Sequence, residues 1–468
     1  MQKSNPKVSV IMPSLNVGNY IEKCIQSVIN QSLKDIEIIC IDAGSTDGTL
    51  EIIKKYSKND NRINLIETDK KSYGYQVNLG IDAANGEYIG IVETDDFIDK
   101  KMYETLYSLT NNGCTDISKV NFYHYYDEDP KNISFRVDKS KKGLPKQEFT
   151  MFEYPNILNG HPCIWAAIYK KSFLIENNIK FMEVSGGGWV DNPFLFETFI
   201  CAKSITFSKE PLYYYRELNP DSSTNSLTDL TLPMRRMLDI FDVLDKYSCH
   251  DKNILAAFYI RIFWHVRDIT SNYNIKKHDD VLFYLSKVLK KLDETIVLTK
   301  FSKADQNNYY KYLDDDLNFE NTIKTTNLLI TESIENNTYE NKQSKLLNLK
   351  INSIFLRFEY SKLKFDNYNS IKKDFMQLYN RNYYNNIYTQ LNLKNKNKLK
   401  LIIESSSYDE FILAYENLKL KEDNKKISEN NKKLKNDINK IEKKINNITS
   451  SKSWKLTKHL RNIKNWIS

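Results

Sequence analysis

The chain has 468 residues, of which 41% are hydrophobic and 27% charged, and its formal net charge is +8. This composition excludes a disordered protein and allows two or three domains with cores of their own. No apolar run approaches the ~18 residues that cross a bilayer and no signal-peptide core is present, so we expect the protein to face the cytosol.

Glycine, proline and charge are distributed unevenly. All 13 glycines lie at or before Gly188 and all 10 prolines at or before Pro233, which predicts an almost wholly helical second half. Residues 413–468 carry 15 Lys and Arg against 6 Asp and Glu, a net charge of +9 that leaves −1 for the rest. The six cysteines are far apart, so neither a disulfide framework nor a zinc site is indicated.

The first part of the chain alternates short apolar runs with amphipathic segments. The expected strands are 8–12, 36–41, 63–67 and 88–92, and the expected helices are about 20–31, 49–57 and 76–84. Such alternation predicts βαβ units and an α/β domain with a mostly parallel sheet.

Three carboxylates, Glu93, Asp95 and Asp96, follow the expected strand 88–92. Ligands of open α/β sheets bind at the carboxyl ends of strands. Crowded carboxylates repel one another unless a cation joins them, and hard oxygen ligands suit Mg²⁺ or Mn²⁺. A solvated acidic turn before the next helix explains the cluster equally well.

Five segments carry a recognisable pattern. They are 8–16 (VSVIMPSLN), 42–49 (DAGSTDGT), 78–80 (NLG), 84–89 (ANGEYI) and 93–96 (ETDD). Together they resemble family 2 glycosyltransferases, whose GT-A fold is Rossmann-like, over about residues 5–220. The resemblance implies a GT-A domain over 1–233, with a donor half (about 5–113) and an acceptor half (about 114–233). Three departures are Ala43 for a second aspartate, Glu93 for the first aspartate of Asp-x-Asp, and Gln76-Val77 for Ala-Arg.

The resemblance also implies a donor site for a UDP-sugar. Asp42 would accept the imide N–H of uracil, and Asp95 would hold Mn²⁺ or Mg²⁺ on the diphosphate with Glu93 and Asp96 beside it. The remaining donor-binding residues would be Pro13, Leu15, Asn16, Lys71 (or Lys70) and Arg216. The alternative is that Asp42 is a turn-forming aspartate before Gly44.

On the acceptor side, three glycines precede Trp189, Val190 and Asp191. Asp191 matches the family's catalytic base, which takes the proton of the acceptor hydroxyl in an inverting transfer, although Val190 replaces the usual Glu. The alternative is that Asp191 only caps a helix. His161, Trp165 and Trp189 supply rings that either stack on acceptor sugars or belong to the core.

The C-terminal half is expected to hold a helical domain (234–412) of unassigned role and a coiled coil (413–449). Apolar residues recur every seven positions, with Asn at three successive a positions, which favours a parallel homodimer. The seam consists of Leu413, Asn417, Leu420, Asn424, Ile427, Asn431, Leu434, Ile438, Ile441, Ile445 and Ile448. A single solvated helix remains the alternative.

The last segment, 450–468, is predicted to be a basic amphipathic helix. It alternates Lys and Arg with Trp and aliphatic residues and has no acidic residue, which is typical of a helix on anionic lipid. The alternative is packing on its own protein. Residues 453–457 (SWKLT) resemble a tail that follows coiled coils in bacterial surface-polysaccharide transferases.

These observations lead to one main hypothesis and one alternative. The main hypothesis is an inverting, metal-dependent transferase that moves a sugar from a UDP-sugar to a glycan or lipid-linked glycan, such as lipooligosaccharide or capsule, at the inner face of a bacterial membrane. The alternative is a catalytically silent scaffold that assembles other enzymes through its coiled coil. No module for reading nucleic acid is recognisable beside the basic tail.

Overall fold

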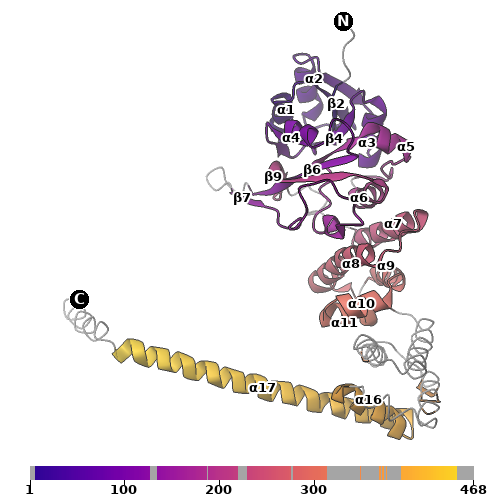
Figure 1. Ribbon diagram of the computed structural model, residues 1–468, viewed down its shortest axis with the longest axis vertical. Coiled ribbons are helices and arrows are strands. Elements are labelled where there is room, and N and C mark those ends of the chain that lie inside the picture. Colours follow the sequence, from indigo (N-terminus) through magenta and orange to yellow (C-terminus); the bar gives the residue numbers. More distant parts are fainter. Residues whose placement is uncertain are drawn as a thin grey trace. The chain divides into compact units, whose positions relative to one another are not determined.

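The computed structural model describes residues 6–126, 134–186, 188–219, 229–275, 278–313 and 392–450, with six isolated residues between the last two ranges. The chain divides into two compact units, Met1–Asp315 and Asp316–Ser468, which we describe separately (Figure 1). The first unit therefore includes the first helices of the region that sequence analysis assigned to a separate helical domain from 234. The expected basic helix, apart from Ser450, lies outside the described residues.

The expected alternation of strands and helices is confirmed at the N-terminus. It consists of β1 (Val8–Ser14), α1 (Ile21–Ile29), β2 (Ile36–Asp42), α2 (Thr49–Ser57), β3 (Ile63–Glu67), α3 (Tyr73–Ala83) and β4 (Tyr88–Ile91). Strand β1 runs through Pro13, because β4 pairs with it only as far as Ile11 and leaves that side free of ladder bonds. Helix α3 begins three residues earlier than expected, because the Ser72 hydroxyl accepts the Tyr75 amide and caps it.

The sheet is mixed, which corrects the expectation of a mostly parallel one. Its order is β3-β2-β1-β4-β8-β6-β9-β5, with β7 beside β6. The four strands β1 to β4 pair in parallel, but β8 (Ala167–Lys170) runs antiparallel to both β4 and β6 (Ile117–Tyr126). The other strands are β5 (Phe97–Ile98), β7 (Ser134–Val137) and β9 (Ile205–Arg216). The parallel half thus carries the loops after β1, β2 and β4, and the mixed half continues the sheet from β4 to β5.

Helices cover the sheet closely. Helix α3 packs on β1 and β2, and α4 (Met102–Ser108) packs on β6 and β8. A Cβ atom on Gly80 of α3 would lie 2.6 Å from Cγ2 of Ile11, so only glycine permits this approach of helix to strand. The acceptor half adds η1 (Pro155–Leu158), α5 (Lys171–Glu176) and α6 (Asp191–Cys201).

A group of helices completes the first unit. It comprises α7 (Leu232–Lys246), α8 (Lys252–Asn272), α9 (Asp279–Lys290), α10 (Glu294–Lys300) and α11 (Lys303–Tyr312). Helix α7 packs on α6, and α8 packs on η1 (Figure 1). Helix α8 starts at Asp251, whose carboxylate accepts the amides of Asn253 and Ile254. These helices therefore reach the acceptor half of the sheet domain.

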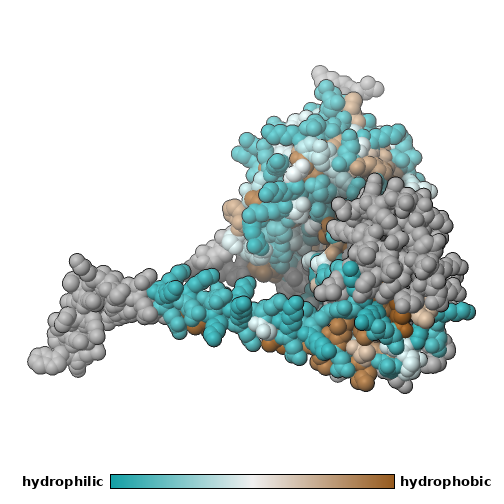
Figure 2. Space-filling model, turned by 60° about the horizontal axis from the view of Figure 1, so that its bottom comes forward, coloured by the Kyte–Doolittle hydropathy of each residue, from teal (hydrophilic) through white to brown (hydrophobic). Residues whose placement is uncertain are grey.

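The described part of the second unit contains α16 (Leu393–Glu404) and the long helix α17 (Tyr408–Ser450). The expected seam lies along α17, and six of its apolar members are between 53 and 62% exposed: Leu413, Leu420, Ile427, Leu434, Ile438 and Ile441. Figure 2 shows this helix as mainly hydrophilic with separate hydrophobic spots along it. Among the described helices, none has the length and apolar character needed to span a bilayer.

A charged clasp joins the far ends of β6 and β9. His124 of β6 bonds through Nε2 to Asp138 (3.3 Å) and through Nδ1 to the carboxylate of Glu217, which directly follows β9. These hydrogen bonds, to Asp138 first and Glu217 second, raise the pKa of His124 to about 9. The clasp therefore holds a protonated histidine and fixes the position of Arg216, the residue before Glu217.

We predict that this clasp makes stability depend on pH. Because the pKa of His124 is higher in the folded state than its ordinary value near 6.5, the stabilisation is complete below about pH 6.5 and is lost as pH rises through about 9. The stability difference between the native chain and His124→Gln should shrink by about 1–3 kcal/mol from pH 6 to pH 9.5. Urea unfolding of the full chain measures it, and a pH-independent difference would contradict the prediction.

Candidate active site

The loops after β1, β2 and β4 meet at one edge of the sheet. The side-chain oxygen of Asn16 accepts the amide of Thr46, and the amide of Asn16 donates to the Ser45 hydroxyl, both at 2.9 Å. The hydroxyl of Thr94 donates to the carbonyl of Pro13 (2.8 Å). The nucleoside-side loop and the acidic segment are thereby held together.

Gln76 has a structural role at this edge. Its buried amide group donates to the carbonyls of Ser14 (2.9 Å) and Ile41 (3.0 Å), at the ends of β1 and β2. The sequence departs from the family pattern at this position and the next one, and the structure shows that the glutamine joins the two strands whose loops would hold a nucleoside.

The two carboxylate oxygens of Asp42, the last residue of β2, have different environments, one in a turn and one without a partner. Its Oδ1 accepts the amides of Gly44 (3.0 Å) and Ser45 (2.9 Å), which forms the turn. Its Oδ2 is buried and has no hydrogen-bond partner among the described residues. A buried acceptor without a donor is costly, so this oxygen is suited to an N–H group of a ligand.

Asp96, which the resemblance places beside the metal-binding Asp95, is an anchor of the fold. Its buried carboxylate accepts the hydroxyl of Tyr213 (2.8 Å) at Oδ2 and the amide of Arg216 (2.7 Å) at Oδ1. Both oxygens are therefore used to attach β9 to the acidic segment. Glu93 also has an internal partner, the Tyr73 hydroxyl at 2.6 Å, and burial raises its pKa to about 8.

Asp95 is the carboxylate that remains available to a metal. Its Oδ2 accepts the side-chain amide of Asn219 (2.8 Å), and its Oδ1 has no partner among the described residues. Within that part of the chain, no cluster of three or more His, Cys, Asp or Glu side chains could hold a metal ion. One carboxylate with substrate phosphates and water is nevertheless a common donor set for Mg²⁺, so Asp95 fits such an ion.

Arg216 lies beside this segment. Its Nε donates to the carbonyl of Asp95 (2.9 Å), and its guanidinium lies over the rings of Tyr20 (4.9 Å) and Tyr125 (5.2 Å). The arginine thus orients the backbone of the residue that fits a metal. Lys71 is exposed, and Lys70 forms an ion pair with Glu183 (2.6 Å).

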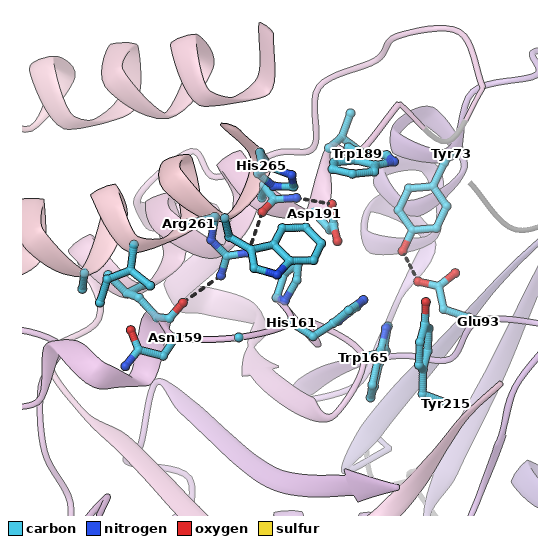
Figure 3. Close-up of a pocket in the computed structure, with 18 of the residues that line it drawn as sticks. Tyr73, Glu93, Asn159, His161, Trp165, Trp189, Asp191, Tyr215, Arg261 and His265 are labelled. Atoms are coloured by element: carbon cyan, nitrogen blue, oxygen red, sulfur yellow. Dashed lines mark hydrogen bonds between the residues drawn. The ribbon is translucent and has the colours of Figure 1, made fainter. Parts of the chain in front are cut away.

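A pocket of about 480 Å³ adjoins the acidic segment. Seven residues singled out from the sequence line it: Glu93, Asp95, Asp96, His161, Trp165, Trp189 and Asp191. Pro13, Leu15, Asn16, Asp42, Lys71 and Arg216 do not. Figure 3 shows Tyr73, Glu93, Trp165 and Tyr215 at one end and Asp191, Arg261 and His265 at the other, with Trp189 and His161 between them.

Asp191 opens α6 but does not cap it, because the cap position belongs to Val190. Burial raises the pKa of Asp191, and Arg261 acts in the opposite direction. Asn192 donates to Oδ1 of Asp191 (3.0 Å) and accepts from Nη1 of Arg261 (3.0 Å). The carboxylate is therefore oriented by an amide that a buried guanidinium holds in turn, as the dashed lines in Figure 3 indicate.

The aromatic residues have different environments. Trp165 is buried and stacks on Tyr213 (ring centroids 3.9 Å apart), so it belongs to the core as well as to the pocket wall. His161 accepts the amide of Cys163 at Nδ1 (3.0 Å), and burial lowers its pKa to about 3, which keeps it neutral. Trp189 lies over His265 at 5.2 Å.

Buried cations hold the loop that carries His161. Nζ of Lys141 donates to the carbonyl of Ile157 (2.7 Å), and Nζ of Lys119 donates to that of Cys163 (2.7 Å). Arg261 adds a bond from Nη2 to the carbonyl of Leu158 (2.7 Å). Three cations, from β6, from the turn after β7 and from α8, thus fix one wall of the pocket.

Sequence analysis missed the contribution of α8. Arg261 and His265 are one turn apart on its buried face, among apolar residues at helical spacing such as Phe258 and Ile262. An arginine on such a face is a usable signal, because a charged side chain is rarely buried without a partner. The periodicity does not tell which partner this is.

The comparisons with known proteins agree with this geometry. A sequence model of glycosyl transferase family 2 matches residues 9–176. The glycosyltransferase GlyG of Streptococcus pneumoniae is 31% identical over 249 residues, which are 51% of this chain and 78% of that protein. The uncharacterized glycosyltransferase EpsJ of Bacillus subtilis is 32% identical over 230 residues, 47% of this chain and 63% of that protein.

A solved structure has the same fold. Residues 1–349 of Staphylococcus aureus TarS, in complex with UDP-GlcNAc, superpose with a TM-score of 0.54 at 20% identity, covering 65% of this chain and 86% of that one. The sheet and the helices that cover it thus form an α/β domain of the GT-A type. The chain belongs to glycosyltransferase family 2.

The different environments of Asp95 and Asp96 lead to a stability prediction. Asp96→Ala leaves the Tyr213 hydroxyl and the Arg216 amide without acceptors, which costs about 1–3 kcal/mol for each group. Asp95→Ala, at a partly exposed position with one side-chain bond, should cost less than about 1 kcal/mol. Urea unfolding of the two full-length variants makes the comparison, and equal losses would contradict the anchoring role of Asp96.

Proposed function

We propose that this family 2 glycosyltransferase moves a hexosyl or N-acetylhexosaminyl group from a UDP-sugar to a hydroxyl of a glycan or lipid-linked glycan. One observation carries the proposal: Asp95, which fits a metal ion, and Asp191, an oriented carboxylate, line the same pocket. A donor diphosphate and an acceptor hydroxyl can therefore meet there.

The donor assignment rests on Asp42. Its unpartnered Oδ2 is suited to the imide N–H of uracil, and Pro13, Leu15 and Asn16 lie in the loop that would run along the nucleoside. TarS, which shares the fold, was solved with UDP-GlcNAc. Arg216, which positions Asp95, and the exposed Lys71 are the cations proposed to contact the diphosphate.

Asp191 is the proposed base of an inverting transfer. Its carboxylate accepts the proton of the acceptor hydroxyl while that oxygen bonds to the anomeric carbon from the face opposite UDP. The bond from that carbon to the phosphate oxygen breaks, and UDP leaves with the electron pair. Mn²⁺ or Mg²⁺ at Asp95, when bound, would neutralise the charge on the departing diphosphate. Asn192, held by Arg261, orients Asp191, and both residues oppose the rise in its pKa that burial causes.

The setting we propose is bacterial surface-polysaccharide synthesis, including lipooligosaccharide and capsule. It is supported by the similarity to bacterial transferases such as GlyG. The chain is also similar to a poly(ribitol-phosphate) beta-glucosyltransferase of Bacillus spizizenii, with 30% identity over 217 residues, which are 45% of this chain and 32% of that protein. Contact of residues 450–468 with the inner face of the cytoplasmic membrane remains a prediction on residues outside the described ones, apart from Ser450.

Variants at the two carboxylates test the proposed function. In the native chain, UDP with Mn²⁺ should raise the melting temperature more than GDP or CDP does, because a ligand that binds the folded state stabilises it. Asp95→Ala should lose the Mn²⁺-dependent part of this rise. Asp191→Asn should keep the rise but lower transfer at least 100-fold, since a positioned base contributes about 10²–10⁴-fold.

Differential scanning fluorimetry and UDP release measure these effects. Phe283→Ala, at an exposed site on α9 outside the pocket, is the control and should behave like the native chain. Unchanged surface glycan in cells that carry only Asp191→Asn would contradict the proposal and favour a silent scaffold.

We also propose that α17 pairs with a second copy of the chain. Its apolar seam is solvent-exposed in the single chain and repeats every seven residues, and Asn417, Asn424 and Asn431 occupy intervening positions that favour a parallel two-stranded register. Such a seam is an unusual surface for an isolated helix, because it keeps large apolar side chains in water at regular intervals.

Light scattering on the full chain and on a chain ending at Ile412 tests the pairing. The full chain should be a dimer and the shortened chain a monomer. Leu420→Lys with Leu434→Lys should also give a monomer, because two charges would be buried in the seam. The same number of chains per particle for all three proteins would rule the pairing out.

A further inference from the structure

Helix α8 supplies a wall of the pocket that neither the family match nor the proposed chemistry explains. The match ends at residue 176, whereas α8 spans Lys252–Asn272. Ile260 and Trp264, one turn apart, both line the pocket. They are 47% and 55% exposed, although most large apolar residues of this unit are buried. An apolar strip therefore faces the same space as Asp191.

The indole of Trp264 is held in place from behind. It meets the ring of His265 edge-to-face, with ring centroids 4.7 Å apart and planes at 77°. His265 is buried and lies against Trp189 on the pocket side, at 5.2 Å (Figure 3). Burial, with Arg261 as a second cause, lowers the pKa of His265 to about 3, so the imidazole between the two indoles is uncharged at neutral pH. Two indoles are thereby fixed around one neutral ring near the proposed base.

The surroundings of Trp264 indicate the kind of ligand. Sugar rings offer an apolar C–H face, which packs on aromatic rings, and hydroxyl groups at the edge, which need polar partners. The pocket has both: the indoles on one side, and Asn159, His161 and Arg267 among its polar lining. The buried Oδ1 of Asn159 has no hydrogen-bond partner among the described residues, and a sterol or acyl chain could not supply one, so the lining favours a carbohydrate.

We propose that Trp264, with Ile260 beside it, is an acceptor-binding residue that packs on the apolar face of a sugar ring of the acceptor glycan. The proposal rests on the proposed function, since it places the acceptor in the pocket that contains Asp191. It assigns acceptor recognition to the helical segment after the family-matched region. The acidic segment at the other end of the pocket is independent of it.

Kinetics of the full chain test the proposal with defined probes. The assay follows UDP release from UDP-glucose, UDP-galactose and UDP-GlcNAc with Mn²⁺, alone and with the methyl and octyl glycosides of glucose, galactose and N-acetylglucosamine and of their disaccharides. Trp264→Ala should raise the KM of the best methyl glycoside at least tenfold. The donor KM and the UDP release without acceptor should stay within twofold.

Two matched variants separate binding from folding. Trp264→Phe keeps an aromatic face and should keep the acceptor KM within about threefold of the native value. Phe283→Ala removes an aromatic ring of similar exposure on α9, outside the pocket, and should change nothing. An acceptor KM within twofold of native in Trp264→Ala would overturn the proposal, and so would an effect confined to octyl glycosides, which would assign the surface to a lipid chain.

The outcome also separates this proposal from the proposed function. If Asp191→Asn abolishes acceptor-dependent UDP release while Trp264→Ala does not alter the acceptor KM, the function stands and the role of Trp264 is wrong. If the native chain releases no UDP from any of the three donors with any of the glycosides, both are wrong.

Discussion

The buried guanidinium of Arg261 is the interaction on which the pocket depends. It joins α8 to the carbonyl of Leu158 and to the side chain of Asn192, and through Asn192 it orients Asp191. Removing it would leave two buried acceptors unpaired, at about 1–3 kcal/mol each, and would raise the pKa of the carboxylate that the transfer requires ionised. Fold stability and the chemistry of the site thus share one side chain.

Buried polar side chains also fix the elements around the proposed donor site. Asp96 gives both carboxylate oxygens to β9, and Gln76 joins β1 to β2, so each element that borders the nucleotide loops is fixed by a buried polar group. These anchors leave Oδ2 of Asp42 and Oδ1 of Asp95 free for ligands within the described structure. The residues that hold the site and the residues proposed to act in it are neighbours in sequence but have separate roles.

The sequence predicted the alternating strands to within two residues, and among the side chains it singled out, Glu93, Asp95, His161 and Asp191 line one pocket. It could not reveal that Asp96 anchors β9. The donors that occupy its carboxylate come from Tyr213 and Arg216, more than a hundred positions away in the sequence. The mixed half of the sheet was missed because β8 is only four residues long. The contribution of α8 was missed because helical periodicity marks a buried face without naming what covers it.

The position of α8 has a consequence for how relatives diverge. The parts proposed to hold the donor lie mostly within the segment shared by the family, whereas one acceptor wall is encoded some eighty residues beyond its end. Mutation can therefore reshape the acceptor wall without disturbing the nucleotide loops. Similarity over the shared segment should consequently predict the donor nucleotide better than the glycan that is extended, and exchange of the helical segment between relatives is a direct route to new linkages.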